Sequence, residues 1–147
     1  ERRKWIHCFD NCTLLLYCIA LDDYTRVLAE DRSTNRFVES HKLFRHMLAF
    51  EPLQSLPIII FFNRVDLLAQ RSPLQPLSTV LTSFQGNPND MAAVQHAICE
   101  QYLHEIPPGR TVFHHLTCAI DCSIMRAILQ DVVQTIVRIA LSSGPIS

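Results

Sequence analysis

Two short segments of this chain carry the residue types that are needed to recognise a purine base. The first is the tetrapeptide Asn-Arg-Val-Asp at positions 63–66, which follows an apolar run. The second is Thr-Cys-Ala at positions 117–119, which follows another strand-like run. Ligand-binding loops of open α/β sheets lie just beyond the carboxyl ends of parallel strands. The two segments are therefore expected to meet at one edge of a sheet.

Guanine is the base that these groups match. Its N1–H and N2–H₂ groups need acceptors, and the two oxygens of the Asp66 carboxylate supply them as a bidentate pair. The Asn63 amide can donate to N7 or join the two loops. The backbone N–H of Ala119, on a tight turn, can donate to O6, and the planar group of Arg64 is expected to lie along the base face. An Asn-x-x-Asp segment alone usually forms a turn with an Asx cap; the preceding strand and the later Thr-Cys-Ala segment favour the base site.

The rest of the chain alternates between strand-like and helix-like segments. Continuous apolar runs are typical of strands that are buried on both faces, and capping residues mark the starts of helices. The stretch 69–89 is polar and is expected to be mostly loop, with room for one short helix. The pattern predicts strands over 13–21, 57–62 and 110–117, and helices from Ser33 or Thr34 to about Leu48, from Asn89 or Asp90 to about His104, and from Asp121 or Ser123 to about Leu141.

Three strands that are each followed by a helix predict parallel βαβ units, and therefore an α/β fold with a parallel three-stranded sheet in the order βαβαβα. Such a small sheet has an exposed edge strand. The chain also begins at Glu1 without a methionine. We therefore expect it to be part of a longer protein with further strands upstream.

Composition narrows the class of protein. The 147 residues are 48% hydrophobic and 18% charged, with a net charge of −1. This balance is typical of a globular domain and gives no electrostatic reason to expect a nucleic acid partner. No apolar run reaches the roughly 18 residues that a membrane-spanning helix needs.

Six cysteines raise alternative chemistries. Several lie in or beside apolar runs, where a thiol behaves as a small hydrophobic group, so reduced thiols are expected. A zinc site at His114, His115, Cys118 and Cys122 is disfavoured, because successive strand residues point to opposite faces. A Cys118–His115 nucleophile pair lacks an orienting third group. The six cysteines are Cys8, Cys12, Cys18, Cys99, Cys118 and Cys122.

A receiver or flavodoxin-like fold remains an alternative to the nucleotide-binding fold. Asp22 or Asp23 would then be the phosphoacceptor, but no lysine ends the last strand, as a receiver requires.

The chain resembles the C-terminal half of the GTPase domain of heterotrimeric G protein α subunits over essentially its whole length. The Asn-Arg-Val-Asp segment resembles that family's Asn-Lys-x-Asp guanine motif, and Thr-Cys-Ala resembles its second base loop. Further matching segments are Arg-Lys-Trp-Ile-His-Cys-Phe at 3–9, Val-Leu-Ala-Glu-Asp at 27–31, Asn-Arg at 35–36 and Glu-Ser-His-Lys-Leu-Phe at 39–44.

The resemblance implies that residues 1–147 are the C-terminal part of a Ras-like P-loop GTPase domain, from the end of switch II to the C-terminus. It implies that the base of GTP or GDP contacts Asn63, Arg64 and Asp66, with Cys118 and Ala119 closing over it. Lys4 and Trp5 would lie on the surface that binds the βγ dimer and effector enzymes, although Trp5 as a plain core anchor is an alternative. The last helix and the tail would engage a G protein-coupled receptor.

Arg64 stands where the family has lysine, Ile120 and Asp121 stand where Thr-Asp is common, and the tail lacks the usual apolar last residue. The family's phosphate loop, switch I, helical domain, magnesium ligands and catalytic residues would lie upstream, so no catalytic residue is expected here. The resemblance thus predicts a GTP-hydrolysing signalling switch for the parent protein, at the cytoplasmic face of the plasma membrane or in the cytoplasm. The alternative is a catalytically dead fragment that acts only through partner binding.

Overall fold

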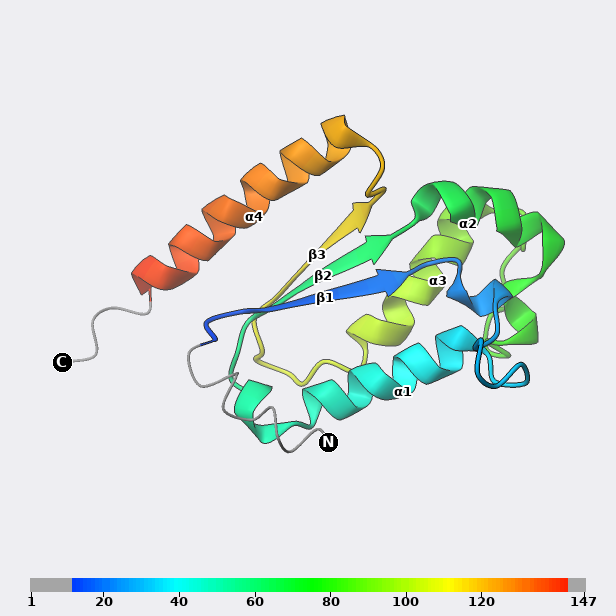
Figure 1. The fold of residues 1–147 in the computed structure, drawn as a ribbon, viewed down its shortest axis with the longest axis horizontal. Helices are drawn as coiled ribbons and strands as arrows, with labels where there is room; N and C mark the ends of the chain where they lie inside the picture. Colours follow the sequence, from blue (N-terminus) through cyan, green and yellow to red (C-terminus); the bar gives the residue numbers. More distant parts are fainter. Residues whose placement is uncertain (1–11, 143–147) are drawn as a thin grey trace.

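A computed structural model describes residues 12–142 of the chain (Figure 1). Strands and helices alternate along it, with short 3-10 turns in the connections. The strands are β1 (Leu15–Ala20), β2 (Ile58–Asn63) and β3 (Val112–Thr117), and the helices are α1 (Arg36–Leu48), α2 (Val65–Arg71), α3 (Met91–Leu103) and α4 (Cys122–Ser142).

The strands form one parallel sheet in the order β1-β2-β3. Helices α1 and α3 cover one face of this sheet, and α4 lies along the other (Figure 1). The predicted α/β fold with a three-stranded parallel sheet is therefore confirmed. Within the described residues, no helix is both long and apolar enough to cross a membrane.

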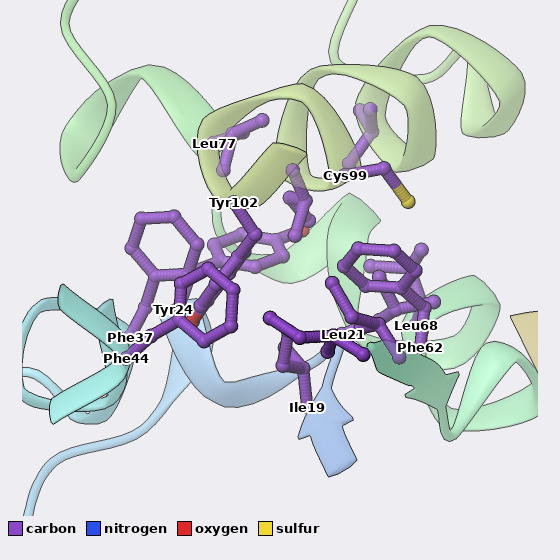
Figure 2. Close-up of a cluster of buried hydrophobic side chains, with 14 of the residues drawn as sticks. Ile19, Leu21, Tyr24, Phe37, Phe44, Phe62, Leu68, Leu77, Cys99 and Tyr102 are labelled. Carbon is purple, nitrogen blue, oxygen red and sulfur yellow. The ribbon is translucent and has the colours of Figure 1, made fainter. Parts of the chain in front are cut away.

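The larger core lies between the sheet and the helices α1 and α3 (Figure 2). Its centre is the buried Tyr102 of α3, whose ring meets Phe37 and Phe44 of α1 at centroid distances of 5.8 and 5.3 Å, and Phe62 of β2 at 6.1 Å. The Tyr102 hydroxyl donates to Ser40 Oγ at 3.1 Å, which satisfies a polar group that burial would otherwise leave unpaired. This aromatic cluster fixes β2, and hence its carboxyl end, against α1 and α3.

The second face of the sheet is only partly covered. Helix α4 buries Val132 against Ile59 and Phe61, but most of its apolar side chains stay exposed, and so does Leu16 of β1 at 46%. The prediction that β1 is buried on both faces is therefore wrong for the described chain, because no described element covers the α4-side face of this edge strand. The exposed large apolar residues of α4 are Ile124, Leu129, Val133, Ile136, Val137 and Leu141.

Two helix boundaries differ from the prediction. Helix α1 begins after Asn35 rather than at a cap on Ser33 or Thr34, because both hydroxyls donate to Asp31 instead. The Asn35 side chain accepts from the Phe37 N–H at 2.9 Å and donates to the Tyr24 carbonyl at 2.7 Å, so one amide both caps the helix and anchors it. The loop is shorter than the predicted stretch 69–89, because α2 starts at Val65, inside the tetrapeptide, and runs to Arg71.

Candidate base-binding site

The two predicted base-reading segments meet at the carboxyl edge of the sheet. Ala20, Asn63 and Thr117 are paired across the last position of β1, β2 and β3, so the segments at 63–66 and 117–119 leave adjacent strands at the same level. Thr117 is buried, whereas Asn63 and Cys118 are half-buried and Ala119 is exposed. The sequence therefore placed these residues together correctly, on the accessible side of the edge.

Beyond the strand pairing, a side-chain hydrogen bond joins the two segments. The Ala119 N–H donates to Asn63 Oδ1 at 3.1 Å, between residues 56 positions apart in the chain. Of the two roles considered for Asn63, the one observed is the tie between loops. The Ala119 N–H, which we had expected to donate to guanine O6, is engaged within the chain. The Asn63 Nδ2 group has no partner among the described residues and is the donor that remains available for a base acceptor.

Asp66 lies in the first turn of α2 and is half-buried. Its carboxylate makes no hydrogen bond or ion pair with any residue that the structure describes, so it does not serve as a turn cap there. A carboxylate with both oxygens unengaged is the acceptor that the N1–H and N2–H₂ groups of guanine require. This geometry favours the base-reading interpretation of Asp66 over the Asx-turn alternative.

Arg64 is held by an ion pair that the sequence did not predict. It has a left-handed backbone, with φ 69° and ψ 38°, and its Nε lies 3.1 Å from Asp22 Oδ1. The other oxygen of Asp22 lies 3.0 Å from Arg71 Nη1. Neither contact has ideal hydrogen-bond geometry, so the attraction is mainly between the charges. Because two guanidinium groups flank the buried Asp22 carboxylate, a phosphoacceptor role for Asp22, as in a receiver fold, is disfavoured.

The second loop is fixed at its far end by Asp121. The Asp121 carboxylate accepts from the Ser123 hydroxyl at 2.7 Å and from the Ser123 and Ile124 N–H groups at 3.0 and 3.1 Å. The Ser123 hydroxyl, followed by the Ile124 N–H, lowers the pKa of Asp121 below its ordinary value. Asp121 is thus the cap of α4 that the sequence predicted. Between these anchors, Ile120 projects into solvent with 81% of its surface exposed.

The geometry of His114 and His115 argues against the zinc site. The His114 ring meets Phe62 of the α1-side core, and the His115 ring meets Phe61 on the opposite face, so the two imidazoles diverge as strand alternation requires. His115 Nε2 lies 3.4 Å from Asp131 of α4, an acidic neighbour that the sequence did not reveal, but no contact between His115 and Cys118 is found among the described residues. Among the residues that the structure describes, no three His, Cys, Asp or Glu side chains gather as metal ligands.

The sheet edge at the candidate site is accessible, since Asn63 and Cys118 are half-buried and Ala119 is exposed. Two concavities, of about 810 and 510 Å³, lie elsewhere. The first runs along α4, and the second lies where α1 and α3 end, beside Arg45 and Arg110. The described residues at this edge would form only one wall of a base site. The predicted partner-binding residues Lys4 and Trp5 lie outside the described residues.

Comparison with known proteins identifies the family. The family model for the G-protein alpha subunit matches residues 1–136. The chain is 38% identical over 141 residues to the guanine nucleotide-binding protein alpha-4 subunit of Dictyostelium discoideum, covering 96% of this chain and 41% of that protein. It is 35% identical over 145 residues to the human guanine nucleotide-binding protein subunit alpha-15, covering 90% and 39%.

The chain therefore spans about two fifths of the length of these curated relatives. Its three-stranded parallel sheet with flanking helices is consistent with half of a P-loop GTPase domain, as the sequence predicted. A family model that matches nearly the whole chain, with relatives above 30% identity, establishes the assignment. The chain belongs to the G-protein alpha subunit family.

Proposed function

We propose that this chain is the guanine-recognising part of a G protein α subunit, a switch that binds GTP and GDP. The observation that carries the proposal is the pairing at the sheet edge: Asn63 and Ala119 lock the two base loops together, while the Asp66 carboxylate beside them has no partner in the described chain. Arg64 flanks this edge, and Cys118 lies at the base of the second loop.

The phosphate-binding groups, the Mg²⁺ ligands and the residues for hydrolysis belong to the upstream half of the domain in this family. GTP hydrolysis is therefore proposed for the whole protein, in which this chain supplies recognition of the base. The whole protein would transduce signals from a G protein-coupled receptor at the cytoplasmic face of the plasma membrane. Its partners would be a βγ dimer and an effector enzyme, bound near Lys4 and Trp5, and a receptor, bound by α4 and the tail.

Nucleotide competition tests the proposal directly. The chain is fused to the upstream part of the Dictyostelium alpha-4 subunit, which restores the length of a complete relative, and labelled GDP is displaced with unlabelled GDP, XDP or ADP. GDP should compete at the lowest concentration, because only guanine offers two donors to Asp66 and an acceptor to Asn63. Displacement by ADP as readily as by GDP would rule out guanine recognition.

A second candidate function is binding to partners without any nucleotide. The exposed apolar side of α4 favours it, because contiguous exposed apolar surface marks interaction sites. In that case, capture of a βγ dimer by the fusion protein would be the same with GDP, with GTP and without nucleotide. Capture that depends on which nucleotide is bound would support the switch.

A further inference from the structure

We propose that Asp22 is a positioning residue for the base site, which holds the short helix α2, and with it the Asp66 carboxylate, through Arg64 and Arg71. The proposal rests on the proposed function, since Asp66 has to be positioned only if it reads guanine. Asp22 lies outside both base-reading segments, 63–66 and 117–119, so neither motif points to it.

The contacts of Asp22 reach both ends of α2. Arg64 is the residue just before the helix, and Arg71 is its last residue. One oxygen of the Asp22 carboxylate lies 3.1 Å from Arg64 Nε, and the other lies 3.0 Å from Arg71 Nη1. Asp22 itself lies two residues after the end of β1 and has no exposed surface. A single rigid group at the sheet edge therefore fixes the start and the end of the helix.

Helix α2 has little else to hold it. It is seven residues long, and only Leu68 is buried, with Val65 partly buried against the core. A helix of this length is not stable without tertiary contacts. Arg64 also has the left-handed backbone that residues other than glycine adopt at a cost, so its surroundings must maintain it. Asp66 comes two residues after Arg64, so a rotation of α2 would turn the carboxylate away from the base.

The charges at this point reinforce the geometry. Two cations compensate the buried Asp22 carboxylate, whose oxygens accept no well-formed hydrogen bond, and removing one side of such a pair is strongly unfavourable. Asp22→Asn would leave two guanidinium groups facing a neutral amide, and both ends of α2 would lose their attachment. Asp23→Asn is a matched control, because the neighbouring Asp23 pairs with Arg36 of α1 at 3.5 Å, and Arg64 is the weakest of the charges that act on it.

The first measurement is amide hydrogen exchange by NMR on the fusion with the upstream part of the Dictyostelium alpha-4 subunit, without added nucleotide. The Leu68 N–H donates to the Arg64 carbonyl at 3.0 Å and reports on the first turn of α2. Asp22→Asn should lower its protection about tenfold relative to the amides of β2, because local opening sets exchange. Asp23→Asn should leave that ratio unchanged. Arg71→Gln removes one partner from a half-exposed position and provides a milder variant should Asp22→Asn fail to fold.

The second measurement is titration of the same fusion protein with GMP, XMP and AMP, in which base contacts give affinities of about millimolar. The unsubstituted chain should prefer GMP. Asp22→Asn should weaken GMP binding about tenfold and should have no further effect in a chain that already carries Asp66→Ala. A merely structural loss would instead weaken binding by the same factor in both backgrounds.

The two measurements separate the possible failures. Unchanged protection of α2 in Asp22→Asn and Arg71→Gln overturns the positioning role, and so does loss of protection with undiminished GMP binding; both leave guanine recognition standing. If the unsubstituted chain binds AMP as well as GMP, the proposed function fails, and the role of Asp22 in recognition fails with it, whatever the exchange of α2 shows.

Discussion

Replacing Asp66 by Asn is expected to exchange guanine for xanthine as the preferred base. Guanine presents N2–H₂ as a donor to the Asp66 carboxylate, whereas xanthine has a carbonyl at that position and needs the N–H₂ of an asparagine. The substitution should leave the fold intact, because the Asp66 side chain has no partner within the described chain. The only local cost is the lost charge in the first turn of α2, of the order of 0.3–1 kcal/mol.

The magnitude follows from the exposure of the group. Hydrogen bonds to a charged group contribute about 1.5–3 kcal/mol, and an unpaired buried donor costs a similar amount. Asp66 is half-buried rather than buried, so we expect a loss of about 2–3 kcal/mol in GDP binding, which is roughly 30- to 150-fold. Binding of XDP should improve at the same time.

The assay is displacement of labelled nucleotide from the fusion with the upstream part of the Dictyostelium alpha-4 subunit, with GDP and XDP as competitors. Asp90→Asn is the matched control, because Asp90 caps α3 through the Ala93 N–H at 3.1 Å and asparagine is a comparable cap. A ratio of GDP to XDP affinity that stays at its unsubstituted value in Asp66→Asn would refute the assignment. It would mean that Asp66 serves the local backbone, where asparagine replaces aspartate well.

Three further predictions concern the core and its titrating groups. Tyr102→Phe should lower the free energy of unfolding by about 1 kcal/mol, because the hydrogen bond to Ser40 is lost. Tyr102→Ala should lower it by about 3–5 kcal/mol, because the missing ring leaves a cavity beside Phe44. Equal losses for the two variants in urea denaturation would contradict the packing of the Tyr102 ring. Burial raises the pKa of Asp23 above its ordinary 3.8, against the opposing charge of Arg36, so the native state keeps a proton that the unfolded chain has lost. The free energy of unfolding should therefore fall as pH rises from the pKa of Asp23 in the unfolded chain to its higher pKa in the native state, and this fall should be absent in Asp23→Asn. Identical pH profiles of the two proteins would show that Asp23 is not the cause. Burial, and secondarily the charge of Glu100, raises the pKa of the Cys99 thiol to about 12 from 9.0, which reduces its thiolate fraction about 1,000-fold. Alkylation followed by mass spectrometry should therefore modify the exposed Cys122 before Cys99. Rapid labelling of Cys99 in the native protein would contradict its burial.

The parts of the site that the sequence predicted are those that local pattern encodes. Asn63 and Thr117 follow apolar runs, and parallel strands bring their carboxyl ends to one edge whatever the intervening chain does. The cap at Asp121 follows from its side-chain chemistry at the start of an amphipathic segment. These features depend on residues close together in the chain, so composition and spacing suffice to find them.

The parts that the sequence did not predict depend on tertiary packing. The Asp22–Arg64 pair joins loops that follow different strands, and Asp22 without that context resembles any acidic residue at a strand end. The start of α2 was missed because Arg64 adopts a left-handed backbone that glycine or asparagine would signal more clearly. Helix α4 has apolar residues on more than one side, a pattern that is typical of a buried helix. Within the described chain, however, only Val132 and Thr135 of α4 are buried.

The central claim is that the edge formed by Asn63, Asp66 and Ala119 holds a guanine base. A crystal structure of the fusion protein with GDP tests it most directly. The account predicts both Asp66 carboxylate oxygens within about 3.2 Å of guanine N1 and N2, with the bond between Asn63 and Ala119 retained. A guanine base that binds elsewhere on the protein, or an Asp66 carboxylate that turns away from it, would contradict the account.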